Sequence, residues 1–165
     1  MKNKRLQAIA DCVINDCIMA DIGTDHAYLP CELIHSKKAV KCYACDIAEG
    51  PLNSAKATIE QERLQDKIEP ILCPGLRDVP KDANVAVIAG MGWMTCKIIL
   101  EDDFDKLSQF DQILIQVNRD VSHLRTWLMN HQFEIELEKV VHDRLFYTIL
   151  GFNPKHKKNY VLTEE

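Results

Sequence analysis

The chain has 165 residues and a formal net charge of −5, and its 47% hydrophobic and 27% charged residues are ordinary for a globular protein with a sizeable core. The acidic balance argues against an extended basic face for nucleic acid, although a local basic patch is compatible with it. No apolar run approaches the roughly 20 residues that cross a bilayer, so neither a membrane span nor a signal peptide is expected.

The N-terminal part alternates between helical and extended patterns. Apolar residues recur at helical spacing over 3–13, which predicts an amphipathic helix. A short apolar run over 17–22 is typical of a strand that is buried on both faces. The next helix is expected over 26–36, with Asp25 as its N-cap and Pro30 within its first turn, where a missing N–H is tolerated.

The same alternation continues through the middle of the chain. It predicts strands at 40–47, 68–73, 85–89 and 112–117, and helices at 50–64, 93–100 and 121–130. Because Pro70 cannot complete a hydrogen-bond ladder, the strand at 68–73 is expected at the edge of the sheet.

Two β-rich runs, 133–141 and 146–152, follow and are joined by the short polar segment 142–144, which predicts an antiparallel hairpin. Strands that alternate with helices imply right-handed crossovers and a parallel sheet with helices on both faces. With the hairpin added, the predicted fold is α/β and Rossmann-like. It has one domain over 1–152, built on a mixed seven-stranded sheet, and a polar tail over 153–165.

The first strand ends in the turn Asp21-Ile22-Gly23-Thr24-Asp25. In doubly wound sheets, ligands bind outside the carboxyl ends of the strands, and a glycine there lets a ligand approach the backbone. The two carboxylates would repel a pyrophosphate, whereas they suit a positively charged ligand such as a sulfonium with an ammonium group. A plain strand-to-helix turn is the alternative interpretation of so short a motif.

Three other strands also end in polar residues or glycines. Asp46 follows the glycine turn by about 20 residues, a position from which a carboxylate can accept both hydroxyl protons of a ribose. The run Ala-Gly-Met-Gly at 89–92 allows close approach of a flat ligand, and the amides of Gln116 and Asn118 suit a neutral base edge. Each of these residues could instead simply end a strand or form a turn.

The seven cysteines have no regular spacing, which favours reduced thiols and a cytoplasmic location. Cys42 and Cys45 have the spacing of a metal-binding pair. However, residues i and i+3 of a strand point to opposite faces, and no second pair follows, so no metal site is expected. The motifs of zinc proteases, serine hydrolases and Walker-type NTPases do not occur.

With these residues in view, the chain resembles the bacterial tRNA (adenine-N1)-methyltransferases of the TrmK family, which are class I S-adenosylmethionine-dependent methyltransferases. The matching segments occur in the family's order and span about residues 4–150. They are Lys4-Arg5-Leu6, Met19 to Pro30, Gly50-Pro51, Gly75-Leu76, Ile88 to Gly92, Gln116 with Asn118, and Arg125 to Leu128. The long run 21–30 and the Gly-Met-Gly turn make this resemblance specific.

The resemblance implies methyl transfer from S-adenosyl-L-methionine to N1 of adenine 22 in tRNA, by a protein that we expect to be a monomer without membrane contact. The cofactor contacts that it implies are Asp21, Gly23, Asp25, His26, Asp46, Ile47, Gly75, Leu76, Ala89, Gly90, Met91 and Gly92. The target base would lie near the Gly-Met-Gly turn. Asp25, as acceptor of a proton from the exocyclic amine, and Asn118 are the candidate catalytic residues.

Four positions depart from the family's pattern. Pro74 replaces an acid that would accept from the cofactor's adenine amine, Trp93 replaces a glycine, Val117 a proline and Thr148 an acid. The loss of one charge-assisted hydrogen bond costs on the order of 1.5–3 kcal/mol. The family also usually continues into a C-terminal helical domain, of which 153–165 would be the start. Two alternatives therefore stay open: a non-catalytic module that binds the cofactor or RNA, and a methyltransferase for a small molecule.

Overall fold

The computed structural model describes residues 3–160. In it, seven strands form one mixed sheet in the order β3-β2-β1-β4-β5-β7-β6. The strands are β1 (Cys17–Ile22), β2 (Ala39–Asp46), β3 (Ile68–Leu72), β4 (Val85–Met91), β5 (Gln112–Val117), β6 (Phe133–Asp143) and β7 (Leu145–Lys157). The helices are α1 (Lys4–Cys12), α2 (Tyr28–His35), α3 (Glu49–Gln61), α4 (Trp93–Asp102), the 3-10 helix η1 (Phe104–Gln109) and α5 (Val121–Asn130). Within residues 3–160, no helix is long and apolar enough to span a membrane.

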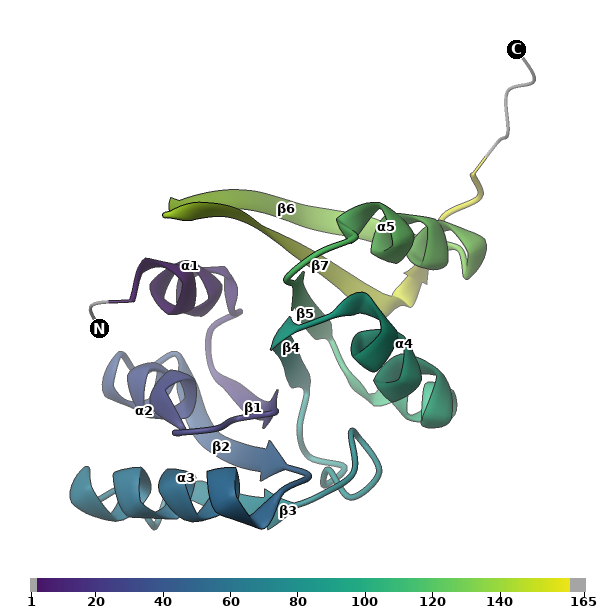
Figure 1. Ribbon diagram of the computed structural model, residues 1–165. Coiled ribbons are helices and arrows are strands. Elements are labelled where there is room, and N and C mark those ends of the chain that lie inside the picture. The colour runs from purple at the N-terminus through teal and green to yellow at the C-terminus, as the bar shows by residue number, and fades with distance from the viewer. Residues whose placement is uncertain (1–2, 161–165) are drawn as a thin grey trace.

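Each face of the sheet has its own apolar core. Figure 1 shows α1, α2 and α3 along one face and α4 and α5 along the other. The first core contains Leu33 of α2, and the second contains Leu124 of α5. Strand side chains alternate between the two cores, so Cys42 packs into the first and Cys45 into the second. The metal-like spacing of these cysteines therefore does not bring their thiols together.

The first five strands are parallel, and their spatial order reverses between β1 and β4. The crevice at the carboxyl ends of two such strands is where α/β proteins bind ligands. We call this edge of the sheet the carboxyl rim. The sequence prediction of a mixed seven-stranded sheet with helices on both faces and a closing hairpin is confirmed, and β3 with Pro70 lies at the sheet edge as expected.

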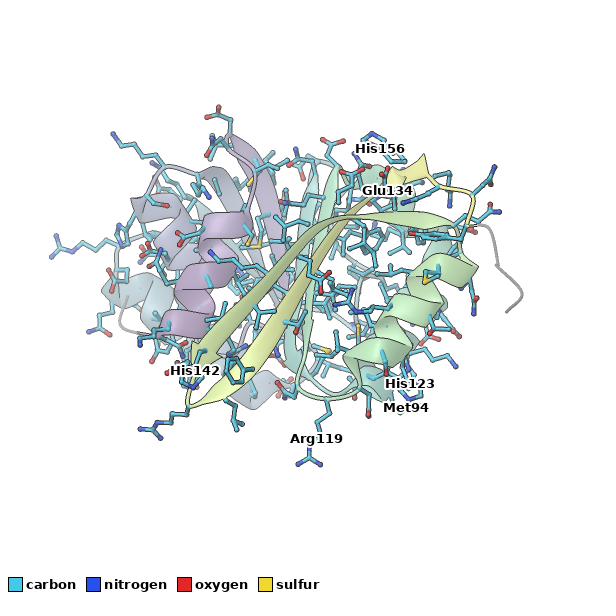
Figure 2. The ribbon with its side chains drawn as sticks, turned by 90° about the horizontal axis from the view of Figure 1, so that it is seen from above. Met94, Arg119, His123, Glu134, His142 and His156 are labelled. Atoms are coloured by element: carbon cyan, nitrogen blue, oxygen red, sulfur yellow. The ribbon has the colours of Figure 1, made fainter. Side chains whose placement is uncertain are left out.

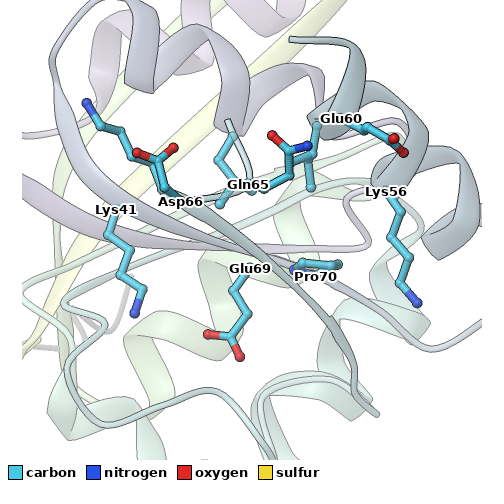
Figure 3. A pocket seen from close by; sticks show the side chains of 10 residues that line it. Lys41, Lys56, Glu60, Gln65, Asp66, Glu69 and Pro70 are labelled. Carbon is cyan, nitrogen blue, oxygen red and sulfur yellow. The ribbon is translucent and has the colours of Figure 1, made fainter. Parts of the chain in front are cut away.

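Charged side chains flank this edge strand. A surface depression of about 420 Å³ runs along β3 and α3, and Figure 3 shows Lys41, Lys56, Glu60 and Glu69 around it. It is formed by the start of β2 and β3 and the end of α3, so it lies away from the carboxyl rim. Charges of both signs at a sheet edge discourage pairing with a further strand.

The turn after β1 differs from the prediction. Helix α2 begins at Tyr28 rather than at residue 26, and Ala27 occupies the N-cap position without a side-chain cap bond. The backbone of Asp25 lies in the left-handed region (φ 56°), and its N–H donates to Asp46 Oδ2 at 3.2 Å. The predicted N-cap role of Asp25 is therefore wrong, because this distant contact fixes the turn and leaves the Asp25 carboxylate 65% exposed. Pro30 lies in the first turn of α2, as expected.

The C-terminal hairpin is longer than the prediction. Strands β6 and β7 pair from Phe133↔Lys157 to Asp143↔Leu145, with Arg144 at the turn in the left-handed region (φ 65°). The segment predicted as a polar tail, 153–165, therefore begins inside β7, where the backbone pairs with β6 as far as Lys157. Residues 161–165 of that segment lie outside the described part of the chain.

Candidate cofactor-binding site

Two cavities meet at Gly23 on the carboxyl rim. The polar cavity, of about 390 Å³, is lined among others by Asp21, Gly23, Asp25, His26, Ala89 and Gly90. The apolar cavity, of about 240 Å³, is lined among others by Gly23, Asp46, Ile47, Gly75 and Met91. The fold thus brings together predicted site residues from the ends of β1, β2, β3 and β4.

Asp21 is the buried carboxylate of the polar cavity. It is 7% exposed, and its Oδ2 accepts a hydrogen bond from the Thr24 hydroxyl at 2.9 Å. Burial raises the pKa of Asp21 to about 7, opposed by the Thr24 bond, with a further rise from Asp46 and a lowering by Arg5. A positively charged ligand beside Asp21 would favour its ionised form. The residue is therefore suited to bind a cation.

Asp46 ends β2 and lines the apolar cavity. Its Oδ2 accepts from the Asp25 N–H at 3.2 Å, and its Oδ1 accepts from the Ala48 N–H at 3.1 Å. These bonds fix the orientation of the carboxylate, and each oxygen keeps capacity for a second hydrogen bond. Asp46 can therefore accept from two neighbouring hydroxyl groups, as expected for a ribose partner.

Gly23 forms the junction between the cavities. It has a φ of +74°, a conformation that glycine adopts without strain, and a Cβ added there would lie 3.4 Å from Met91 Cε. The Met91 side chain, which lines the apolar cavity, therefore lies against Gly23 at the junction of the two cavities. Because methionine has three rotatable bonds and adapts readily, a ligand that spans both cavities can displace it.

The far part of the apolar cavity is suited to a flat apolar ring. Ile47, Ile98 and Ile99 line it, and Gly75 lies close against Ile99, which a Cβ at Gly75 would contact at 3.5 Å. Pro74, which stands where the family usually has an acid, is also part of this lining. It adds apolar surface and no side-chain acceptor.

Two carboxylates that the sequence prediction did not include lie at the same cavity. Asp102 ends α4, and Asp103 follows it and faces Arg77, with 3.8 Å between Oδ1 and Nε. Both come from the C-terminal end of a helix, where no local sequence signal distinguishes a ligand contact from a surface acid. Only the packing of α4 against the Gly75 turn brings them to the cavity.

Arg5 of α1 is also part of the site. Its Nη1 donates to Gln116 Oε1 at 2.8 Å, and the same oxygen accepts from the Gly90 N–H at 3.1 Å. Gln116 is 1% exposed, and its Nε2 donates to Asn118 Oδ1 at 3.3 Å. The sequence position of Gln116 suggested that its amide faces a base. The amide instead holds the Gly90 turn in place. Apart from the family-like segment at 4–6, nothing in the sequence pattern points to Arg5.

Replacing Arg5 with alanine should loosen this turn. Gln116 Oε1 would keep only the Gly90 partner, so we expect the free energy of unfolding to fall by about 1–3 kcal/mol. Urea denaturation measures the change. Lys4→Ala, at an exposed position on the same helix, is the control and should stay within about 0.5 kcal/mol of the parent. Equal stability of the two variants would contradict a bracing role for Arg5.

Three predicted site residues lie apart from the lining of both cavities. The Leu76 side chain is fully buried in the second core, and a cofactor contact of this residue stays a prediction. Gly92 is the N-cap residue of α4. Asn118 is exposed, and its N–H donates to the Met91 carbonyl at 2.9 Å. A cofactor contact of Gly92 and a catalytic role of Asn118 stay predictions.

The other three positions that depart from the family's pattern lie outside the lining of both cavities. Trp93 is 8% exposed and packs edge-on against Trp127, with 6.5 Å between ring centroids, so it does not fill either cavity. Val117 is buried at the end of β5, and Thr148 is half-buried opposite Val140. Within residues 3–160, no three His, Cys, Asp or Glu side chains cluster closely enough to hold a metal ion.

Comparison with known proteins identifies relatives along nearly the whole chain. A family model described as "Methyltransferase domain" matches residues 2–150. The tRNA (adenine(22)-N(1))-methyltransferase of Bacillus subtilis (strain 168) is 37% identical over 142 residues, which are 86% of this chain and 60% of the relative. The chain thus spans less than two thirds of that protein's length.

Two solved structures share the fold closely. M. capricolum TrmK in complex with S-adenosyl-homocysteine is 32% identical with a TM-score of 0.87, and the match covers 98% of this chain and 73% of that one. A Streptococcus pneumoniae protein in complex with S-adenosyl-L-methionine is 34% identical with a TM-score of 0.91, over 99% of this chain and 76% of that one. The chain therefore belongs to the methyltransferase domain family and, within it, to the TrmK group.

Proposed function

We propose that the protein transfers a methyl group from S-adenosyl-L-methionine to N1 of adenine 22 in tRNA. The observation that carries the proposal is the junction at Gly23, where a polar cavity with a buried acid meets an apolar cavity with a second acid. Membership of the TrmK group, and the cofactor or its product bound in two relatives, support the same assignment.

The residues at the junction fit this cofactor part by part. The carboxylate of Asp21 suits the positive charges of a sulfonium amino acid, and the two oxygens of Asp46 suit the ribose hydroxyls. The isoleucines of the apolar cavity suit the adenine ring. Gly23 borders both cavities and carries no side chain, so one elongated ligand can lie across it once the Met91 side chain moves aside.

When bound, this cofactor supplies a methyl group on a positively charged sulfur, which the N1 lone pair of adenine can take in line while the S–C electron pair stays with sulfur. The protein's contribution is then alignment, which can supply a large part of a rate enhancement. Because N1 lies on the Watson–Crick edge, the target adenine must be unpaired. Gly90, with a φ of +78°, lines the polar cavity beside the Arg5 guanidinium, and Asp25 on the same cavity is the candidate acceptor of an amine proton.

Cofactor affinity should depend on the protonation of Asp21. Its pKa of about 7 means that the acid is largely neutral below pH 7, when it offers no charge to a cationic ligand. We expect Kd to fall as the pH rises towards 7, by up to about tenfold per pH unit, and to level off above it. Calorimetric titration from pH 5.5 to pH 8.5 measures this, with Asp21→Asn as a pH-independent control. A flat profile for the parent protein would contradict the role of Asp21.

The reaction itself is tested with methyl-labelled cofactor and unmodified tRNA, with a tRNA that carries guanine at position 22 as control. The proposal predicts label at N1 of adenine 22 and none in the control. Cofactor binding without label in tRNA would identify a non-catalytic module. Label in a small acceptor and none in tRNA would identify a small-molecule methyltransferase.

A further inference from the structure

The outer part of the C-terminal hairpin projects past the central sheet. Pairing between β5 and β7 reaches Ile115↔Leu150, and β5 ends at Val117, whereas β6 and β7 stay paired as far as Asp143↔Leu145. Since β7 runs antiparallel to β5, the overhang lies beyond the carboxyl rim, on the edge where the two cavities open. Figure 1 shows the two strands continuing past β5 on the side of the molecule where α1 lies. We call residues 140–147 the hairpin arm.

The hairpin arm exposes apolar and aromatic side chains. Phe146 is 75% exposed, Leu145 66% and Val140 58%. His142 lies directly opposite Phe146 in the strand pair, and their ring centroids are 4.7 Å apart. The two rings therefore form a small exposed platform, the kind of surface on which unpaired nucleobases stack.

Positive charge accompanies this platform. Arg144 forms the turn of the hairpin arm, and Arg119 lies in the loop after β5; both are exposed. Figure 2 shows His142 and Arg119 along the same edge of the molecule. Within residues 3–160, neither arginine has a carboxylate within ion-pair distance, whereas Arg125 is paired with Glu138. Arg119 and Arg144 are thus free to contact phosphate groups.

The hairpin arm is also connected to the candidate site. Tyr147 points to the opposite face of the hairpin from Phe146, and the Arg5 guanidinium carbon lies 5.9 Å from the centre of its ring. Arg5 in turn lines the polar cavity and lies against Gly90. The inner face of the hairpin arm therefore contacts Arg5 beside the polar cavity, and the platform of Phe146 and His142 lies on the outer face of the same arm.

We propose that the hairpin arm binds the RNA substrate next to the target adenine, and this rests on the proposed function for the identity of that RNA. Phe146 and His142 stack on unpaired bases, and Arg144 and Arg119 contact the backbone. An aromatic platform next to arginines that have no carboxylate partner is suited to bind single-stranded nucleic acid, in which bases and phosphates alternate. RNA binding at the hairpin arm is also compatible with the chain's net charge of −5, because it requires only a local basic surface.

The test is binding of fluorescent, unmodified tRNA to the whole chain, measured by anisotropy. Phe146→Ala is expected to weaken binding about tenfold, since one base–aromatic stack contributes about that much or more. Arg144→Ala should weaken binding and lower the slope of log K against log salt by about 0.7, as expected for one lost phosphate contact. Both variants should keep the parent's cofactor Kd and melting temperature, because the altered side chains are exposed and lie outside the two cavities.

Matched controls come from the opposite edge of the sheet. Val40→Ala removes an exposed apolar side chain at the start of β2, and Arg63→Ala removes an exposed arginine after α3. Both should bind tRNA as the parent does. Parent-like binding by Phe146→Ala and Arg144→Ala would overturn the proposal. So would a loss of self-association in Phe146→Ala with unchanged tRNA affinity, which would mean that the hairpin arm packs against a second copy of the chain.

The experiment separates this proposal from the proposed function. If the parent binds tRNA through the hairpin arm but transfers no methyl group, the hairpin proposal holds and the enzymatic one fails. If methyl transfer to adenine 22 is intact in the hairpin variants with unchanged KM for tRNA, the enzymatic proposal holds and the hairpin proposal fails. A parent protein that binds no tRNA at all would overturn the hairpin proposal, while its cofactor affinity would still be measurable.

Discussion

At pH 8, replacing Asp21 with asparagine is expected to raise the free energy of unfolding by about 2–4 kcal/mol. Burial raises the pKa of this carboxyl from 3.8 to about 7 in the folded protein, so its ionisation is disfavoured in the fold. Its contribution to stability is therefore fully present below about pH 4 and is lost as the pH rises to about 7. Asparagine keeps an acceptor for the Thr24 hydroxyl and does not ionise.

Urea denaturation at pH 4, pH 6 and pH 8 measures this effect. The difference between Asp21→Asn and the parent should vanish near pH 4 and be largest at pH 8. Asp16→Asn, at an exposed position just before β1, is the control and should show no such trend. A difference that does not depend on pH would mean that the Asp21 carboxylate is hydrated in the folded protein.

The same substitution should weaken cofactor binding at pH 8 by one to two decades, which corresponds to the loss of about 1.5–3 kcal/mol from one charge-assisted hydrogen bond. A variant that gains stability and loses affinity would show that the buried acid is kept for binding at the expense of stability. Unchanged affinity in Asp21→Asn would remove this residue from the list of cofactor contacts.

The second large effect is expected at Gly23. Alanine there must adopt a φ of +74°, which costs an L-residue about 1–2 kcal/mol, and its Cβ would lie 3.4 Å from Met91 Cε at the junction of the cavities. We expect Gly23→Ala to lose about that much stability and to bind the cofactor at least about tenfold more weakly, a difference of about 1.4 kcal/mol. Thermal unfolding and calorimetric titration measure the two effects.

Two further variants show whether the effect arises at the junction. Gly50→Ala adds a methyl group within α3 with no heavy atom within 4 Å, so it should fold at least as well as the parent and bind the cofactor normally. In the double variant Gly23→Ala/Met91→Ala, the contact with Met91 is gone but the Cβ still occupies the ligand path. Recovery of full affinity in the double variant would mean that the cofactor does not pass over Gly23.

The fold could be predicted from the sequence because local patterns suffice for it. Continuous apolar runs separated by amphipathic helices dictate a parallel sheet covered on both faces, and Pro70 alone places β3 at an edge. The errors occur where a distant contact decides the local conformation. Asp25 looks like a helix cap in sequence, but its N–H bonds to Asp46 on the next strand. The end of β7 looks like a polar tail, but its backbone pairs with β6 as far as Lys157.

The candidate site was predictable to the extent that glycines and acids at strand ends reveal it. The turns at Gly23, Asp46, Gly75 and Gly90 all meet at the two cavities. Arg5 could not be assigned a role, because its partner Gln116 is 111 positions away in the chain. Adjacent residues can also face different surroundings, which sequence proximity does not reveal: Gly75 lines the apolar cavity, whereas the Leu76 side chain is in the core.

A crystal structure of the chain with S-adenosyl-L-homocysteine tests the central claim most directly. We expect the ligand to lie across Gly23, with its amino-acid part beside Asp21, its ribose on Asp46, its adenine ring among Ile47, Ile98 and Ile99, and the Met91 side chain displaced. A ligand confined to one cavity with Met91 still in place, or bound elsewhere on the molecule, would contradict the claim that the two cavities form one cofactor site.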